Sequence, residues 1–320
     1  MQTITQTFYA QALTASIDPN LCHQDVSFHV SHPVNDLSNL AEFETKFAKP
    51  LRTSMPDAER RCLIELQDID TQGNGWIAAT GHFVGTYQHA FLGMPANGRP
   101  MFMRFTEMVE IENMQIKSVY LLIDFLDMMN QLGCNPLRPS LGASEMIMAP
   151  ADQNGLRDMS APEQRERTIA LVQSMLEELA KFDGESLLSM HLEDYWHPNF
   201  MWYGPAGIGT TRGIEGFRKH HQGPFVFAFP DRSIDHKMAF IAQGDFAATG
   251  GWPHMHGTHT GDTWLGLPAS NKQVSLRVMD IWRQDSGLLV ENWVGIDIIH
   301  ILSQLGIDVF EQMQASANRN

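Results

Sequence analysis

The chain has 320 residues, of which 43% are hydrophobic and 18% are charged, and its formal net charge is −15 at pH 7. This length is sufficient for two domains of ordinary size, and the composition is that of a globular protein. The acidic balance argues against a nucleic-acid partner, because binding to phosphates depends on clustered lysine and arginine.

The amino-terminal segment Met1–Gln6 has neither the basic start nor the apolar run of a secretory signal. No stretch of the sequence approaches the roughly 18 consecutive apolar residues of a membrane helix. We therefore expect a cytoplasmic location and no membrane partner. The cysteines, Cys22, Cys62 and Cys134, are odd in number and form no Cys-x-x-Cys pair, which indicates reduced thiols.

Residues 1–135 are predicted to form one α+β unit. One of its strands alternates apolar residues with a single carboxylate on the same face: Met101, Met103, Phe105, Glu107 and Val109. The following strand ends at Asp124, and the apolar residues after it recur at helical spacing. This change of period predicts a short helix that stops at Gly133.

Residues 136–162 are predicted to be a linker, because Pro136, Pro139 and Gly142 occur there without any sustained hydrophobic period. Residues 163–320 are predicted to form a second α+β unit. Helices are expected over Glu163–Phe182 and around Gly213–Phe217. Four strands should follow, over residues 234–240, 246–256, 273–283 and 288–297, and the tight turns between them predict a curved antiparallel sheet covered by helices.

The two units repeat each other. Asp297 lies 297 − 124 = 173 positions after Asp124, and Asp280 lies at the same offset from Glu107. Two further pairs keep this register: Arg104 with Arg277, and Gln131-Leu132-Gly133 with Gln304-Leu305-Gly306. Each half is therefore expected to fold as one copy of a duplicated domain.

The repeated acids suggest proton-transfer chemistry. A carboxylate on an apolar face has a raised pKa unless it finds a partner, and such a group can take and return a proton near neutral pH. We expect Asp297, at a strand end, to face a pocket together with Asp280, and Asp124 to be the copy of Asp297. The alternative is that Asp280 and Glu107 cap loops or pair with an arginine.

Short motifs follow one another through the second half: Trp196-His197-Pro198, Thr211-Arg212-Gly213, Ala228-Phe229-Pro230-Asp231, Gly257-Thr258-His259-Thr260-Gly261, Leu265-Gly266-Leu267-Pro268, Trp293-x-x-x-Asp297 and Gln304-Leu305-Gly306. In this order and spacing they resemble the SnoaL-like polyketide cyclases of the nuclear transport factor 2-like superfamily. The first half departs from the pattern, with Tyr87 in place of the histidine and Tyr120 in place of the tryptophan.

The resemblance implies two tandem cone-shaped α+β barrels, each a curved sheet with helices on its concave face around an apolar pocket. It also implies cofactor-free closure of a polyketide ring by intramolecular aldol condensation, with Asp297 as the acid/base. His259 is the first expected donor to the developing oxyanion, with His256 and Trp293 behind it. The other expected pocket residues are His197, Trp282, Glu107, Tyr87 and Tyr120.

Other functions remain open on this fold, because one superfold hosts many activities. The protein could instead bind a small hydrophobic molecule without chemistry, or act as an isomerase or hydrolase. The spacing of His254, His256 and His259 fits no standard zinc pattern, so no metal is expected. The resemblance further suggests that the two halves form a pseudo-dimer within one chain, which would be a monomer or a weak dimer and would bind a small hydrophobic carbonyl compound.

Overall fold

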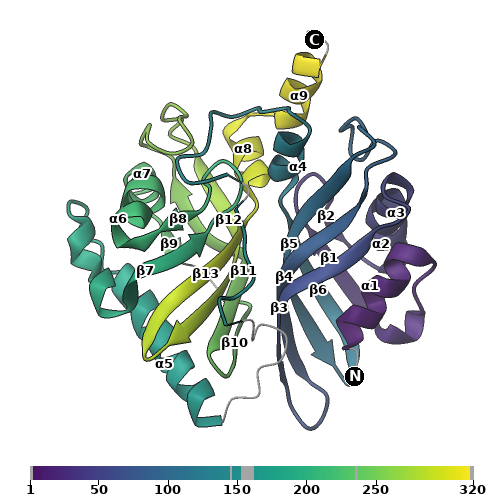
Figure 1. Ribbon diagram of the computed structural model, residues 1–320, viewed down its shortest axis with the longest axis horizontal. Helices are drawn as coiled ribbons and strands as arrows, with labels where there is room; N and C mark the ends of the chain where they lie inside the picture. The colour runs from purple at the N-terminus through teal and green to yellow at the C-terminus, as the bar shows by residue number, and fades with distance from the viewer. Residues whose placement is uncertain (1–2, 145, 153–161, 235–236, 318–320) are drawn as a thin grey trace.

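The computed structural model describes residues 3–144, 146–152, 162–234 and 237–317. Two α+β domains follow each other along the chain and stand side by side (Figure 1), which confirms the predicted fold class and the tandem duplication. Most of the predicted linker is visible between them, but its residues 145 and 153–161 lie outside the described part. Within the described ranges, no helix is long and apolar enough to cross a membrane.

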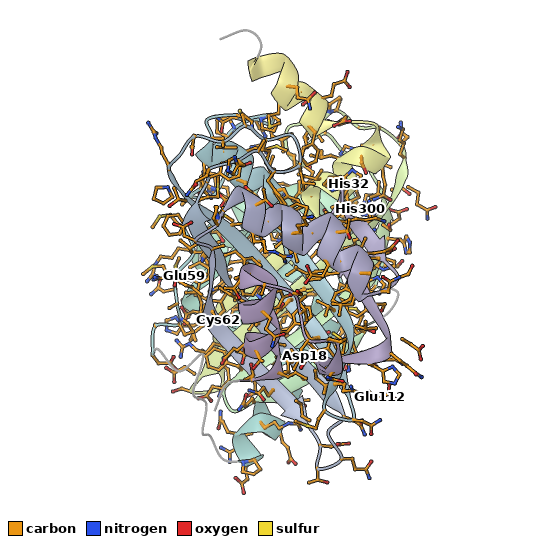
Figure 2. The ribbon with its side chains drawn as sticks, turned by 90° about the vertical axis from the view of Figure 1, so that its right-hand side faces the viewer. Asp18, His32, Glu59, Cys62, Glu112 and His300 are labelled. Carbon is orange, nitrogen blue, oxygen red and sulfur yellow. The ribbon has the colours of Figure 1, made fainter. Side chains whose placement is uncertain are left out.

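The first domain is a six-stranded sheet with the order β2-β1-β6-β5-β4-β3. Its strands are β1 (Cys22–Val30), β2 (Asn35–Leu37), β3 (Glu59–Ile69), β4 (Gly75–Thr86), β5 (Pro100–Glu112) and β6 (Gln115–Ile123). Its α-helices are α1 (Ile4–Thr14), α2 (Leu40–Phe43), α3 (Lys49–Ser54) and α4 (Phe125–Gln131). Helices α1 to α3 lie across the outer face of this sheet, away from the second domain (Figures 1 and 2).

The second domain has the main strand order β10-β11-β12-β13-β7-β8, and β9 pairs with β11. Its strands are β7 (Trp196–Tyr203), β8 (Thr211–Arg212), β9 (Ser233–Ile234), β10 (Ala239–Gln243), β11 (Phe246–Thr258), β12 (Gln273–Asp285) and β13 (Leu288–Ile296). Its α-helices are α5 (Pro162–Leu179), α6 (Gly213–Phe217), α7 (Gly223–Ala228), α8 (Ile298–Leu305) and α9 (Val309–Ala317).

Both sheets are mixed, which the prediction of antiparallel sheets did not include. Strands joined by tight turns pair antiparallel as expected, for example β11 with β12 and β12 with β13. However, β1 pairs parallel with β6, and β7 pairs parallel with β13. The reason is topological: in each domain the first long strand joins the last one, and a connection through helices allows parallel pairing.

The predicted change from strand to helix is confirmed at both repeated aspartates. Asp124 accepts a hydrogen bond from the Asp127 amide (3.0 Å) and caps α4, and Asp297 caps α8 in the same way through the His300 amide (3.2 Å). Helix α8 ends at Gly306, whose φ of 87° lies in the left-handed region that favours glycine.

The two sheets pack against each other through the faces that their own helices leave free (Figure 1). This contact forms a separate apolar core with members from both domains: Ile64, Leu66, Ala78, Met108, Leu122, Tyr203, Ile241, Phe246, Ala248, Met279, Ile281 and Trp293. Arg104 crosses the contact and donates to the carbonyl oxygens of Gly204 (2.7 Å) and Val294 (3.0 Å). Each sheet therefore has one face toward the other domain and one face toward its own helices, and the second face is not covered by the contact between the domains.

Candidate functional site

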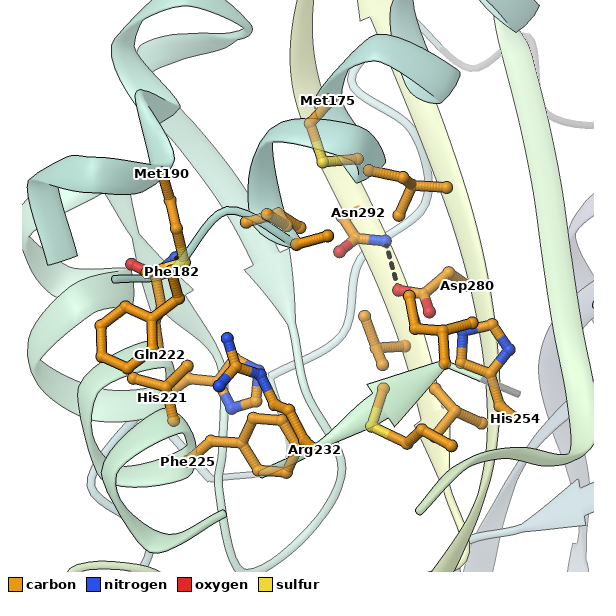
Figure 3. Close-up of a pocket in the computed structure, with 18 of the residues that line it drawn as sticks. Met175, Phe182, Met190, His221, Gln222, Phe225, Arg232, His254, Asp280 and Asn292 are labelled. Atoms are coloured by element: carbon orange, nitrogen blue, oxygen red, sulfur yellow. Dashed lines mark hydrogen bonds between the residues drawn. The ribbon is translucent and has the colours of Figure 1, made fainter. Parts of the chain in front are cut away.

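A cavity of about 450 Å³ lies in the second domain between its sheet and its helices (Figure 3). This volume is in the range of small-molecule binding sites. The walls are mainly apolar and aromatic. They come from α5 and the segment after it, from α6 and α7, and from the strands: Met175, Leu176, Leu179, Phe182, Trp196, Trp202, Phe217, Phe225, Val226, Leu276, Val278, Trp282, Val294 and Ile296. A few polar side chains interrupt this lining, and they define what the cavity can do.

Asp280 is the carboxylate of the cavity lining. It lies on β12, where Leu276, Val278, Asp280 and Trp282 alternate toward the helices and the residues between them face the first domain. Asn292 Nδ2 on the neighbouring strand β13 donates a hydrogen bond to Asp280 Oδ1 (3.2 Å). Figure 3 shows this pair with His254 beside it.

Burial raises the pKa of Asp280 to about 7, and the hydrogen bond from Asn292 opposes that rise. The described residues place no arginine or lysine in hydrogen-bonding or ion-pairing contact with Asp280, which explains why burial dominates. A carboxyl group with this pKa exchanges a proton readily at neutral pH, so Asp280 is suited to act as a general base and then as a general acid.

Three other polar groups of the lining are held against apolar neighbours. Trp196 Nε1 and Gln222 Oε1 are buried without a hydrogen-bond partner in the described structure, and so is Nδ1 of His221. His221 stacks on Trp202, with ring centroids 4.0 Å apart, and burial lowers its pKa to about 3. This imidazole is therefore neutral at physiological pH. Buried polar groups are normally paired, so these three atoms are exceptions among the residues that surround the cavity.

The structure places two of the predicted second-domain site residues, Asp280 and Trp282, in this cavity lining. Asp297, His259, His256, Trp293 and His197 are not part of it. Trp293 lies on the opposite face of β13 from Asn292 and Val294, where it stacks on Tyr203 in the contact between the sheets. His197 is exposed at the start of β7. The strand period separates these side chains from the cavity, although the residues are neighbours in sequence.

Asp297 is only 2% exposed and is held by three donors outside the cavity lining. In addition to the His300 amide, its carboxylate accepts from the His32 amide of the first domain (2.9 Å) and from Arg277 Nη1 (3.1 Å). Burial raises the pKa of Asp297, and these hydrogen bonds and the charge of Arg277 oppose the rise. Figure 2 labels His32 and His300, the two residues whose amides bind Asp297. Asp297 therefore caps α8 and also links the two domains through hydrogen bonds.

We expect replacement of Asp297 with alanine to lower the free energy of unfolding by about 2–4 kcal/mol. The variant removes the cap of α8 and leaves the buried Arg277 without its carboxylate. Denaturant unfolding would measure the loss. Asp308 provides a matched control, because it caps α9 through the Phe310 amide (2.9 Å) but is exposed. Asp308→Ala should lose only about 1 kcal/mol, and equal losses in the two variants would contradict a role in fastening the domains.

His259 and its counterpart Tyr87 are completely buried, and both form hydrogen bonds with the loops that follow them. Tyr87 donates from its hydroxyl to the Met94 carbonyl oxygen (2.7 Å), and the backbone carbonyl of His259 accepts from the amides of Ser270 (3.1 Å) and Asn271 (2.9 Å). Burial lowers the pKa of His259. Both residues thus hold a turn in place, and neither of them lines the cavity.

In the described part of the first domain, Glu107 occupies the position of Asp280 but is paired with an arginine. Glu107 is 0% exposed and forms a short ion pair with Arg60, whose guanidinium also lies over the rings of Tyr9 (4.8 Å) and Phe105 (4.7 Å). Burial raises the pKa of Glu107, and Arg60 opposes that rise. These side chains fill the space between the sheet and α1.

The other expected first-domain residues belong to the contact between domains. Asp124 accepts from the Ala206 amide of the second domain (2.8 Å), as its copy Asp297 does from His32. Tyr120 stacks on His29, with ring centroids 4.4 Å apart, on the face of the sheet that also approaches Trp252 of the second domain. The repeated acids at the strand ends therefore have matching structural positions.

Several residues of the cavity were not predicted from the sequence. Asn292 could have been predicted from the sequence, because alternation along β13 places it on one face with Val294 and Ile296. Local periodicity could not have placed Arg232 or His221 in the cavity, because they come from a loop and a helical turn whose orientation depends on packing. Within the described residues there is no group of three or more side chains arranged to hold a metal ion.

The chain is a tandem pair of sheet domains, each covered by helices on one face. The second domain has an apolar cavity between its sheet and helices, and in the first domain Arg60 and Glu107 fill the corresponding space. A family model described as SnoaL-like polyketide cyclase matches this chain twice, over residues 3–132 and 171–305. The two matches together span well over half of the sequence. The chain therefore belongs to the SnoaL-like polyketide cyclase family, and the predicted family relationship is confirmed.

Solved structures with a similar fold each align with less than half of this chain. AclR from Streptomyces galilaeus is 23% identical, with 44% of this chain and 86% of that chain covered and a TM-score of 0.35. IdmH from Streptomyces antibioticus is 22% identical, with 44% and 99% covered and a TM-score of 0.35. An NTF2-like protein from Burkholderia xenovorans is 14% identical, with 44% and 97% covered and a TM-score of 0.34. A comparison with curated proteins finds no match.

Proposed function

We propose that the second domain catalyses proton transfer on a small hydrophobic carbonyl compound, in a cofactor-free ring closure of the aldol type. The observation that carries this proposal is Asp280, a carboxylate with a pKa near 7 in an otherwise apolar cavity of about 450 Å³. Membership of the SnoaL-like polyketide cyclase family supports the reaction class. In this proposal Asp280 takes the acid/base role that the family resemblance implies for Asp297, because Asp280 lines the cavity and Asp297 does not.

The reaction begins with Asp280 as a carboxylate. It accepts a proton from the carbon next to a substrate carbonyl, which leaves an enolate, and the enolate carbon attacks a second carbonyl of the same molecule. A carbon–carbon bond forms, and the second carbonyl oxygen becomes an alkoxide that takes the proton back from Asp280. Holding both carbonyl groups in one cavity supplies the proximity that an intramolecular closure requires.

The same cavity could serve a carrier of hydrophobic molecules, or an isomerase or hydrolase. A carrier needs only apolar walls, whereas a desolvated carboxylate without a cationic partner destabilises the protein and is typical of functional sites. An isomerase would share the first proton transfer with a cyclase and differ in the fate of the enolate. Proton abstraction is therefore the step that separates the enzymatic proposals from simple binding.

Exchange of the α-hydrogens of 1-tetralone in D₂O, followed by NMR, tests this step without knowledge of the natural substrate. We expect the wild-type protein to accelerate exchange at the carbon next to the carbonyl group. A bicyclic ketone of this size fits within the cavity volume. If bound 1-tetralone exchanges no faster than it does in buffer, the proposed proton transfer is wrong and a carrier function is favoured.

The exchange rate should increase with pH through a midpoint near 7, because Asp280 acts as a base only when it is ionised. Asn292 stabilises the ionised form, so Asn292→Leu should move the midpoint to higher pH. Rate measurements from about pH 5 to 9 would show the shift. Asn199, which is exposed on β7, provides the control, because Asn199→Leu should leave the midpoint unchanged. A midpoint that stays in place in Asn292→Leu would contradict the assignment of Asp280.

A further inference from the structure

The cavity contains a cation as well as a carboxylate. Arg232 lies in the segment between α7 and β9, lines the cavity, and holds its guanidinium 5.2 Å from the centre of the Phe182 ring. No carboxylate among the described residues forms a salt bridge with it. In contrast, the cavity-filling Arg60 of the first domain is paired with Glu107. Arg232 is therefore a cation whose partner can come from a ligand.

The position of Arg232 separates it from the proposed base. In Figure 3, Asp280, Asn292 and His254 lie together on one side of the view, and Arg232, His221 and Phe225 lie on the other. Burial lowers the pKa of Arg232, although an arginine remains charged at any physiological pH. Desolvation of a charge is unfavourable unless an opposite charge or hydrogen-bond acceptors offset it.

Arg232 is the polar group of this part of the lining that remains accessible, in contrast to two buried polar groups of the same cavity. Gln222 is 4% exposed, and its Oε1 has no hydrogen-bond partner in the described structure; Trp196 is 2% exposed, and its Nε1 likewise has none. Both residues line the same cavity. These two atoms are covered by their neighbours, whereas Arg232 is only partly buried and can be reached by a ligand. A hydrocarbon ligand would desolvate the guanidinium without compensation, and a carboxylate would pair with it.

We propose that the cavity binds aromatic carbonyl compounds that carry a carboxylate group, with the carboxylate paired to Arg232 and the reacting carbon directed toward Asp280. A carboxylate matches the planar guanidinium through two parallel hydrogen bonds. The guanidinium carbon of Arg232 lies over the Phe182 ring, which leaves the nitrogen atoms to a ligand. The orientation of the reacting carbon rests on the proposed function, but the recognition of the carboxylate by Arg232 does not.

Calorimetric binding of 2-naphthoic acid and 2-naphthamide tests the charge recognition directly, because the two compounds have nearly the same size and differ in charge at neutral pH. We expect the wild-type protein to bind the acid at least about tenfold more tightly than the amide. Arg232→Met retains the length of the side chain and its contact with Phe182, and it should abolish this preference without weakening amide binding. Arg212, exposed on β8, provides the control variant Arg212→Met, which should retain the preference.

Equal affinities of the wild-type protein for the acid and the amide, or no binding of the acid, would overturn the inference. So would an Arg232→Met variant that still prefers the acid. These outcomes are independent of the chemistry at Asp280. If Arg232→Met loses the preference while 1-tetralone shows no accelerated exchange, carboxylate recognition stands and the proposed reaction fails; the opposite pattern retains the reaction and removes the carboxylate from the substrate class.

Discussion

Replacement of Asp280 with asparagine should reduce the enzyme-dependent exchange of α-hydrogens by about a thousandfold or more. The amide cannot accept the proton, although it has nearly the same shape as the carboxylate and can still hydrogen-bond to Asn292. NMR-detected exchange of 1-tetralone would measure the loss, and calorimetry with 2-naphthoic acid would show that the cavity still binds ligands. Undiminished exchange in Asp280→Asn would contradict the proposed role of this residue.

The stability of Asp280→Asn and the exchange rate of Asp297→Asn distinguish loss of catalysis from loss of structure. The ionised Asp280 destabilises the fold, because its pKa in the native protein lies above the ordinary value of 3.8. That effect is absent below pH 3.8 and reaches its full size above pH 7, so Asp280→Asn should be more stable than wild type at pH 8, by on the order of 2–4 kcal/mol. Asp297→Asn is the matched control: it neutralises a buried aspartate outside the cavity and should retain exchange at the wild-type rate.

Replacement of Glu107 with alanine should lower the free energy of unfolding by about 3–5 kcal/mol, because it leaves the buried Arg60 without its main partner. The side chain of Arg60 is 5% exposed, and its remaining carboxylate contact, with Glu65, is longer at 3.5 Å. Urea unfolding monitored by circular dichroism would measure the change. Glu59→Ala should change stability by less than about 0.5 kcal/mol, because Glu59 is exposed.

The double variant Arg60→Ile/Glu107→Leu extends this test. Replacement of a buried ion pair with apolar side chains of similar volume is often neutral, so the double variant should recover most of the stability that Glu107→Ala loses. A double variant as unstable as Glu107→Ala would mean that the ion pair itself, and not the unpaired charge, determines the stability of the first domain.

The comparison of the two domains explains why the space beside Asp280 is open, whereas the space beside Glu107 is filled by described side chains. Arg60 follows Asp57 by three residues, and in the second domain Ile234 follows the matching Asp231 by three residues. Arg60 pairs with Phe83 of β4, and Ile234 pairs with Met255 of β11, the counterpart of β4. An arginine therefore neutralises the acid and fills the space in the first domain. The second domain has an isoleucine at this position, and Asp280 has no cationic partner among the described residues.

The sequence alone was sufficient for the α+β class and the duplication, because these depend on local period and on repetition at a constant offset. The residues of the repeated motifs, however, stabilise the fold through hydrogen bonds to the backbone. Asp57 accepts from the Thr86 amide (2.7 Å), and Asp231 accepts from the Thr258 amide (2.7 Å). Gln131 and Gln304 likewise bind the backbone of β5 and β12 at the same position in each domain. Residues that both halves share are thus the ones that both halves need in order to fold.

The tertiary structure alone decided which carboxylate faces the cavity. Alternation along β12 marked Asp280 as a member of an apolar face, but the sequence could not show that Asp297, at the following strand end, would cap α8 and meet Arg277 and the first domain. Those contacts involve residues up to 265 positions apart, as between His32 and Asp297. The environment that raises the pKa of one acid and fixes the other in place arises from packing between segments distant in sequence, and local periodicity carries no information about it.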